Sequence, residues 1–400
     1  MDELAINGGP PVREEMLPYG SQTIDQEDIE AAVEVLRSDW LTTGPTVDDF
    51  EQAVADYVGA RHGVAVSNGT AALHTAMRIA GISQGDEVIV PTLTFAASAN
   101  AALFEGAVPV FADVDPGTLL LDPEDVAERI TARTEAILPV DFAGQPCDYR
   151  ALRDLADDHD LALIADGCHA LGADQDGRKV GSLAYATCFR FHPVKHITTG
   201  EGGMVTTDEA SWAEHGRRFR HPGMVRGQGG PIDDGPWAYK IPELGQNYRL
   251  TDLQCALGLT QLAKLDGWVE RRRQIAARYD EAFQALPGIE PLATRRGAFH
   301  AYHLYVVRID EQHLGMDRRQ VFEALRAEGI GVNVHYIPVH LQPFYRETLG
   351  TKGGMCPNAE EAYQEILSLP MFPTMTSMDT EDVLAAMQKI TGEEMQGGSR

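Results

Sequence analysis

The chain has 400 residues, of which 44% are hydrophobic and 23% charged, a composition typical of a globular enzyme of about two or three domains and not of a disordered or fibrous protein. The formal net charge of −27 argues against nucleic acid or an anionic membrane surface as a partner, because both require clustered positive charge. The acidic N-terminal sequence, the lack of a long apolar run and five cysteines without a CxxC pair lead us to expect a cytoplasmic protein with reduced thiols.

The first half of the chain alternates helical and strand-like patterns. IDQEDIEAAVEVLRSD spaces Ile29, Ala32, Val33 and Leu36 as one face of a helix, and VDDFEQAVADYVGA is a second amphipathic stretch. The apolar runs HGVAVSN, DEVIVPTLTF and EAILPVDFAG are each followed by a helical pattern, and LALIADG is a further apolar run. This rhythm predicts an α/β fold with a mostly parallel sheet, whose ligands lie at the carboxyl ends of the strands.

The second half begins with a long helical pattern. Its N-cap is Thr251 or Asp252, and its apolar positions extend to Ile275. HAYHLYVVRID then predicts a strand, DRRQVFEALRAEG a helix, GVNVHYI another strand and TEDVLAAMQKI a C-terminal helix. We therefore expect an N-terminal arm (1–22), a large α/β domain (23–262), and an interdomain helix with a small α+β domain (263–400).

Two loops that follow predicted strands suggest a site. SNGTAAL, at residues 67–73, opens a helix whose free N–H groups suit an anion such as phosphate, although these residue types also make ordinary helix caps. In LALIADGCHALG, Asp166 ends an apolar strand and His169 follows three residues later. The Asp166 carboxylate could keep a ring nitrogen protonated, or it could cap a helix.

A third loop contains Lys195. The chain has only six lysines, and Lys195 alone lies in apolar and glycine-rich sequence, CFRFHPVKHITTGEGG. Burial beside Phe191, Pro193 and Val194 would disfavour the charged amine and make the neutral form accessible for a Schiff base. A phosphate loop, a carboxylate for a pyridinium and a buried amine together indicate pyridoxal 5'-phosphate.

The order of five motifs extends this interpretation to a family. NGTAAL, PTLTFAASANA, ADGCHALG, FHPVKHITTGEGG and LGQNYRLTDLQCALGLTQL resemble the DegT/DnrJ/EryC1/StrS sugar aminotransferases over nearly the whole chain. The resemblance implies fold type I of the pyridoxal-phosphate aminotransferases, with a large, mostly parallel sheet domain and a smaller α+β C-terminal domain. It also implies a homodimer with shared active sites, acting on a nucleotide-sugar and glutamate.

The resemblance assigns a role to each residue that matches a family motif. Lys195 would bond to the cofactor and then move the reacting proton, Asp166 would pair with the pyridine nitrogen, and His169 would approach the ring hydroxyl. The other cofactor contacts would be the phosphate-binding turn Gly69, Thr70 and Ala71, the stacking aromatic Phe95 and, from the partner subunit, Asn247.

One position departs from the family pattern. Where the family has SFHPxK, with the serine hydroxyl on the phosphate, this chain has RFHPVK, so Arg190 replaces the serine. A guanidinium could hold the phosphate by charge-assisted hydrogen bonds, or it could turn toward the sugar nucleotide or solvent. We predict the phosphate contact.

Four further histidines need an interpretation. His335 and His340, in VHYIPVH, would line the sugar pocket by the same resemblance, and a packing or surface role is the alternative. His192 and His196 have the i, i+4 spacing of metal ligands, but Pro193 disfavours a helix through them and no third ligand is indicated. We therefore predict no metal site.

Three phrases, PYGSQTIDQEDI, FHPVKHITTGEGG and HYIPVHLQPFY, are most similar to one branch of the family. That branch aminates C4 of UDP-linked 4-keto-6-deoxy-N-acetylhexosamines on the way to pseudaminic acid, and the resemblance implies a ping-pong reaction with glutamate as amino donor. The alternatives are another dTDP-, GDP- or UDP-linked 3- or 4-keto sugar, a related dehydratase, and a non-catalytic regulatory protein that binds pyridoxal phosphate. The related dehydratases have histidine in place of the lysine, so Lys195 argues against that second alternative.

Overall fold

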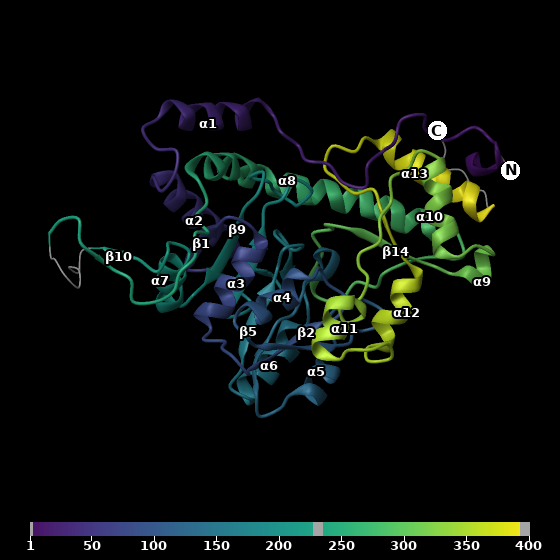
Figure 1. The fold of residues 1–400 in the computed structure, drawn as a ribbon. Helices are drawn as coiled ribbons and strands as arrows, with labels where there is room; N and C mark the ends of the chain where they lie inside the picture. The colour runs from purple at the N-terminus through teal and green to yellow at the C-terminus, as the bar shows by residue number, and fades with distance from the viewer. Residues whose placement is uncertain (1–2, 227–234, 393–400) are drawn as a thin grey trace.

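A seven-stranded sheet forms the centre of the computed structural model, which describes residues 3–226 and 235–392 (Figure 1). The strand order is β1-β9-β8-β5-β4-β2-β3. Four of the six pairings between neighbouring strands are parallel, and only β9 runs antiparallel to its neighbours β1 and β8. The predicted mostly parallel sheet is therefore confirmed. Its strands are β1 (His62–Val66), β2 (Glu87–Pro91), β3 (Val108–Ala112), β4 (Thr134–Ile137), β5 (Ala162–Asp166), β8 (Ala186–Arg190) and β9 (Gly203–Thr207).

Helices connect these strands and pack on the sheet in two groups. One group is α3, which contacts β8 and β9, together with its neighbours α4 and α7. The other group is α5 and α6, which contact each other and the strands β3, β4 and β5. Nearly all residues of β2, β4, β5 and β9 are buried, as expected for strands covered on both faces. The helices are α2 (Pro45–Val58), α3 (Gly69–Ile79), α4 (Ala97–Phe104), α5 (Pro123–Arg129), α6 (Tyr149–Asp158) and α7 (Ala210–Phe219).

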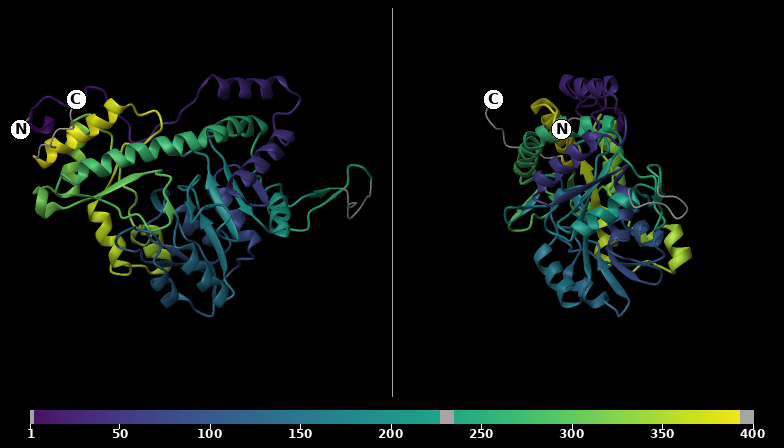
Figure 2. Two further views of the ribbon diagram at one scale, coloured as in Figure 1. Left: turned by 180° about the vertical axis from the view of Figure 1, so that it is seen from behind. Right: turned by 90° about the vertical axis from the view of Figure 1, so that its left-hand side faces the viewer.

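A single 32-residue helix, α8 (Asp252–Phe283), runs along both halves of the molecule (Figures 1 and 2). Thr251 is its N-cap, in a capping box with Gln254, so the first of the two predicted caps is correct. Asp252 is instead fully buried and accepts hydrogen bonds from the backbone N–H groups of Gly44 and Thr46, at the start of α2. Thr251 thus caps α8, while Asp252 connects α8 to the start of α2 through hydrogen bonds.

A second hydrophobic core lies at the other end of α8. It joins Ile275 and Tyr279 of α8 to the sheet β12-β14-β15 and to α10 and α13. Leu17 of the N-terminal segment packs into this core. The division into three parts stays a prediction, and α8 crosses the expected boundary after residue 262 without a break. These elements are β12 (Ile289–Pro291), β14 (Tyr305–Ile309), β15 (Ile366–Leu369), α10 (Arg318–Ala327) and α13 (Ser377–Thr391).

Shorter elements complete the described chain. A hairpin, β10 with β11, extends away from the body of the molecule beyond α7 (Figure 1), and β13, β6 and β7 form a small separate sheet. Within the described residues, no helix is both long and apolar enough to cross a membrane. The remaining bounds are η1 (Ala5–Asn7), α1 (Gln26–Arg37), η2 (Phe142–Gly144), β6 (Asp174–Gln175), β7 (Arg178–Lys179), β10 (Val225–Arg226), β11 (Tyr239–Lys240), β13 (Ala298–Phe299), α9 (Glu311–Leu314), η3 (Val339–Leu341), α11 (Pro343–Leu349) and α12 (Pro357–Glu365).

Two predicted strands differ from the structure. In HAYHLYVVRID only Tyr305–Ile309 forms a strand, because the preceding backbone bonds to a loop: Ala301 N–H donates to Gly144, and Leu304 N–H donates to Ala143. GVNVHYI is not a regular strand and makes only isolated bridges, such as that between Asn333 and Ser368. Residues 300–304 and 331–337 therefore form no regular strand.

Candidate active site

Eight of the eleven predicted site residues line one cavity of about 280 Å³. The cavity lies where β2, β5 and β8 end and α3 begins, which is the edge of the sheet that the βαβ pattern predicts. The loop after β8 and the segment 333–336 close its other sides. The eight residues are Gly69, Thr70, Phe95, Asp166, His169, Arg190, Lys195 and His335.

One end of the cavity suits an anion. The side chain of Asn68 accepts a hydrogen bond from Ala71 N–H at 2.8 Å, and the N–H groups of Gly69 and Thr70, at the first positions of the helix, have no partner within it. Arg190 packs directly on Gly69, where a Cβ atom would lie 2.8 Å from the Arg190 Cβ. Arg190 Nε is buried and has no hydrogen-bond partner among the described residues. A phosphate here would meet both the helix start and the guanidinium.

A buried carboxylate lies at the carboxyl end of β5. Asp166 is only 6% exposed; its Oδ2 accepts a hydrogen bond from Ser98 Oγ at 2.7 Å, and its Oδ1 accepts one from Cys168 N–H at 3.2 Å. The residues after Asp166 form turns, so the alternative of a helix cap is not realised. Because a buried carboxylate is stabilised by a cationic partner, Asp166 can hold a proton on a ring nitrogen.

Lys195 lies in the cavity wall beyond β8. Burial is the main cause that lowers the pKa of its amine to about 8; Arg190 and Arg272 act in the same direction, while Cys168 and Asp166 oppose it. A sizeable fraction of the amine is therefore neutral near physiological pH, as nucleophilic attack on an aldehyde requires. The Lys195 Nζ atom lies 3.1 Å from Nε2 of His303, a residue that the sequence interpretation had not singled out.

The remaining lining residues form a slot for a flat ring. The side chain of Phe95 is 52% exposed, and its ring centre lies 6.1 Å from that of Tyr336. Tyr336 in turn contacts His169, with 3.2 Å between its hydroxyl and Nε2. Burial lowers the pKa of His169 well below its usual value, so its ring is neutral, and its Nδ1 has no hydrogen-bond partner in the described part of the chain. The His169 ring is thus able to bond to a ligand hydroxyl.

Three predicted residues lie outside the cavity. Ala71 is buried in α3, and its N–H is already donated to Asn68. Asn247 is exposed and contributes nothing to the cavity of its own chain, which leaves open the expected contact with a partner subunit. His340 is the third, and the structure gives it a packing role.

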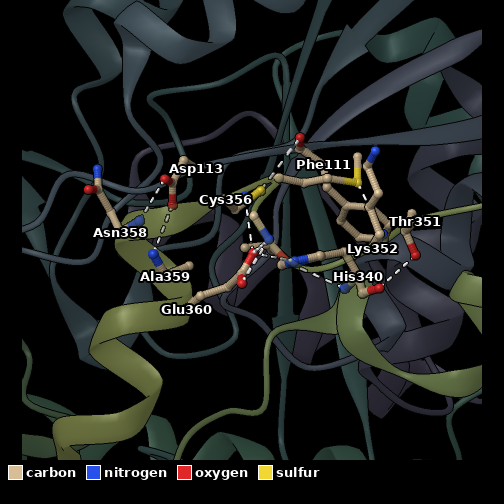
Figure 3. Close-up of polar contacts among 12 residues, drawn as sticks. Phe111, Asp113, His340, Thr351, Lys352, Cys356, Asn358, Ala359 and Glu360 are labelled. Carbon is tan, nitrogen blue, oxygen red and sulfur yellow. Dashed lines mark hydrogen bonds and ion pairs between the residues drawn. The ribbon is translucent and has the colours of Figure 1, made fainter.

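His340 is fully buried between two polar partners, one of which is Glu360 (Figure 3). Its Nδ1 bonds to Thr92 Oγ1 at 2.5 Å, and its Nε2 bonds to Glu360 at 3.0 Å. Thr351 Oγ1 donates to its backbone carbonyl. Both ring nitrogens are occupied, and His340 does not line the cavity described here. Its contacts are those of the packing alternative.

His335 does line the cavity. Its Nδ1 bonds to Ser368 Oγ at 2.8 Å, and burial lowers the pKa of the ring to about 4. Tyr19 from the N-terminal segment lines the cavity beside it, with the two ring centres 5.5 Å apart. Sequence reasoning missed Tyr19 and His303, which reach the site from segments distant in sequence, and it missed Tyr336 beside the predicted His335.

The site fits pyridoxal phosphate on structural grounds. The start of α3 and the guanidinium of Arg190, whose Nε has no hydrogen-bond partner in the part of the chain that the structure describes, lie at one end. A buried carboxylate lies on the floor, and an amine with a lowered pKa lies in the wall beside a half-exposed aromatic ring. These are the groups that a phosphate, a pyridine nitrogen, an aldehyde and a ring face require.

Comparisons with known proteins agree with this geometry. The model of the DegT/DnrJ/EryC1/StrS aminotransferase family matches residues 22–388. The chain is 42% identical over 380 residues to the spore coat polysaccharide biosynthesis protein SpsC of Bacillus subtilis (strain 168), a match that covers 94% of this chain and 98% of that protein.

Solved structures give the same result. PseC of Helicobacter pylori, described as an aminotransferase involved in the biosynthesis of pseudoaminic acid, superimposes with a TM-score of 0.88 at 30% identity, covering 94% of this chain and 100% of that chain. The PLP-form of the putative sugar aminotransferase Spr1654 of Streptococcus pneumoniae also has a TM-score of 0.88, at 29% identity, covering 94% of this chain and 99% of that one.

Proposed function

The chain belongs to the DegT/DnrJ/EryC1/StrS aminotransferase family and is thus a sugar aminotransferase that uses pyridoxal phosphate, and from this premise we propose its substrate and donor. The proposed reaction moves the amino group of glutamate to C4 of a UDP-linked 4-keto-6-deoxy-N-acetylhexosamine. The structural similarity to PseC and the three sequence phrases that resemble the pseudaminic acid branch support this choice.

One observation carries the proposal. Lys195, with a pKa lowered to about 8, and the buried carboxylate of Asp166 line the same cavity. When bound, the cofactor supplies a ring that accepts the electron pair of a bond to the reacting carbon. In our proposal Asp166 keeps a proton on the ring nitrogen, which makes the ring a better electron acceptor.

The other residues would bind and orient the cofactor. Gly69 and Thr70 would hold the phosphate through their N–H groups, and Arg190 would hold it through its guanidinium. Phe95 would stack on the exposed ring face, and His169 would bond to the ring hydroxyl. Ala71 would support the phosphate end through its hydrogen bond to Asn68.

Lys195 would then handle the reacting proton. In the first half reaction its Nζ accepts the proton that leaves Cα of glutamate, and 2-oxoglutarate departs. In the second half reaction Nζ returns a proton to the sugar carbon that bears the new amine. Its lowered pKa suits both proton transfers near neutral pH, because an amine with a pKa of about 8 can accept a proton and release it again.

The sugar would bind at the open side of the cavity. His335 and Tyr336 line that side from the segment before η3, and Tyr19 lines it from the N-terminal segment. The ring centres of Tyr19 and His335 lie 5.5 Å apart. This side therefore presents aromatic rings that carry a few polar groups, a surface that suits a sugar ring.

We further propose that two copies of the chain form a homodimer with shared active sites. Asn247 is exposed and outside its own cavity, and Asn247 of the partner subunit would reach the cofactor phosphate. Large apolar side chains near it are exposed, as expected for a surface that another protein covers: Trp237, Tyr239, Ile241 and Leu244.

Mass spectrometry of the reaction products tests the proposed function. Purified protein, pyridoxal phosphate and glutamate are mixed with UDP-, dTDP- and GDP-linked 4-keto and 3-keto sugars. We expect a new amine on the UDP-linked N-acetyl 4-keto sugar. Amination of a different sugar would keep the enzyme class and reject this substrate. No product with any sugar from cofactor-loaded protein would reject the proposed reaction.

A further inference from the structure

A histidine outside every sequence motif contacts the reacting amine. His303 Nε2 lies 3.1 Å from Lys195 Nζ, the only hydrogen-bond partner of that amine in the described structure. His303 is 5% exposed, and its Nδ1 is buried without a partner in residues 3–226 and 235–392. The imidazole therefore makes its one side-chain hydrogen bond to Lys195.

The backbone fixes this histidine in place. Arg272 of α8, fully buried, donates from Nη1 to the carbonyl groups of Tyr302, His303 and Met371. The N–H groups of Ala301 and Leu304 bond to the loop at residues 143–144. The backbone is thus held on both sides of His303, and burial leaves the ring few rotamers, so its Nε2 stays directed at the amine.

The surroundings keep the His303 ring neutral. Burial lowers its pKa well below the usual value, and the nearby positive charge of Lys195 acts in the same direction. A neutral imidazole carries one proton, on either nitrogen. The groups that face Lys195 and His303 from the packed elements are Asp166, Cys168, His169, Arg190, His196, Arg272 and His335. Among these, Cys168 and Asp166 act to raise the pKa of Lys195 and so favour its ammonium form.

We infer that His303 is a positioning residue for Lys195, which accepts a hydrogen bond from the free amine at Nε2 and holds Nζ toward the cavity. This inference rests on the proposed role of Lys195. The His303 proton must then lie on Nδ1, because a protonated Lys195 can only donate. No proton is transferred to His303; its lone pair holds one N–H of the amine whenever that amine is not bonded to a ligand.

The pKa of Lys195 distinguishes this positioning role from simple packing. A neutral acceptor stabilises the ammonium form, so its loss should lower the pKa of Lys195 further. A hydrogen bond to a charged group corresponds to a shift of about one pH unit. Glutamine places an amide oxygen near the position of Nε2 and should restore the wild-type value, whereas leucine cannot.

The test measures the reactivity of Lys195 in the apoprotein as a function of pH. Cyanate modifies neutral amines, and the rate of carbamylation at Lys195 is followed by peptide mass spectrometry. We expect a midpoint near pH 8 for wild type and His303→Gln, and about one unit lower for His303→Leu. His300→Asn is the matched control, because His300 is buried in the same segment and bonds to Tyr302 N–H. Its midpoint should equal that of wild type.

An unchanged midpoint in His303→Leu, or equal shifts in the leucine and glutamine variants, would overturn the inference. If His303→Leu does not fold, ¹⁵N NMR of histidine-labelled wild-type apoprotein at pH 7 can show which ring nitrogen of His303 carries the proton. A proton on Nε2 would exclude the acceptor role. The cyanate reaction needs no transamination. A protein with the expected midpoints that aminates no sugar would therefore contradict the proposed function alone.

Discussion

Lys195 combines reactivity with a stability cost. Its pKa is about 8 in the folded protein, against 10.5 for the ordinary side chain. Between these two values the unfolded chain binds more protons than the folded chain, so stability rises with pH in that window. Below pH 8 the folded protein bears the full cost, which is about 3 kcal/mol by this linkage.

We therefore expect Lys195→Met to stabilise the apoprotein at pH 7. The gain in the free energy of unfolding should be about 1–3 kcal/mol, because methionine has a similar length and carries no charge that burial would desolvate. The gain should shrink by pH 9.5, where much of the wild-type amine is neutral in the folded state. Urea unfolding at both pH values measures it, with Lys352→Met at an exposed lysine as control. A variant no more stable than wild type at pH 7 would contradict the argument.

Arg190 gives a second prediction for a single side chain. Replacing it with serine, the usual residue of the family, exchanges a charge-assisted hydrogen bond to the phosphate for a neutral one. We expect the dissociation constant of pyridoxal phosphate to rise about tenfold, as measured by equilibrium dialysis. Glu201→Gln is the control, because Glu201 Oε1 lies 3.6 Å from Arg190 Nη2 and its loss leaves the guanidinium in place. Unchanged affinity in Arg190→Ser would mean that Arg190 turns toward the sugar nucleotide or solvent instead.

The individual helices and strands differ in how far their local sequence determines them. The amphipathic spacing of α1 with its Asp25 capping box was predictable, and so was the start of α8 at the polar cap Thr251. The strand-like alternation of HAYHLYVVRID was misleading, because hydrogen bonds to residues 143 and 144 hold its first half out of the sheet. His303 was missed for that reason. His340 was misplaced because its partner Thr92 is 248 residues away.

The start of α12 depends on a carboxylate from another element. Asp113, at the end of β3, accepts hydrogen bonds from Asn358 N–H and Ala359 N–H, both at 2.9 Å (Figure 3). We expect Asp113→Ala to lower the free energy of unfolding by about 2 kcal/mol, because the buried N–H of Ala359 and the partly buried N–H of Asn358 lose their acceptor. Urea unfolding measures this.

A surface helix cap serves as the control for Asp113. Asp317 is exposed and caps α10 through Gln320 N–H, so water can replace it. Asp317→Ala should cost about 0.5–1 kcal/mol. Equal costs for the two variants would show that the contact between β3 and α12 adds nothing beyond an ordinary cap.

At the scale of the whole molecule, α8 links two cores and the active site lies between segments from both. The large sheet supplies Asp166, Arg190 and the start of α3, and the segments before β14 and η3 supply His303 and Tyr336. Motif order predicted the first set, since each residue follows a strand of the βαβ pattern. His303 could not be predicted, because its position depends on how distant segments pack, whereas Tyr336 adjoins His335, which the family resemblance did predict.

The proposed dimer gives a prediction at this scale. Leu244 and Met378 are both 74% exposed, but only Leu244 lies in the segment near Asn247. We expect Leu244→Asp to shift the protein toward monomer and to weaken cofactor binding, because the contact from Asn247 of the partner subunit is lost. Met378→Asp should change neither. Sedimentation velocity measures the assembly state, and a monomeric wild type at micromolar concentration would reject the shared site.

The most direct test of the account is to find which lysine bonds to the cofactor. Protein loaded with pyridoxal phosphate is reduced with borohydride, digested, and searched by mass spectrometry for a pyridoxyl group on any of the six lysines. We predict one group per chain, on Lys195, which lines the same cavity as the carboxylate of Asp166. A pyridoxyl group on Lys179, Lys240 or another lysine, or on none, would contradict the assignment of the site.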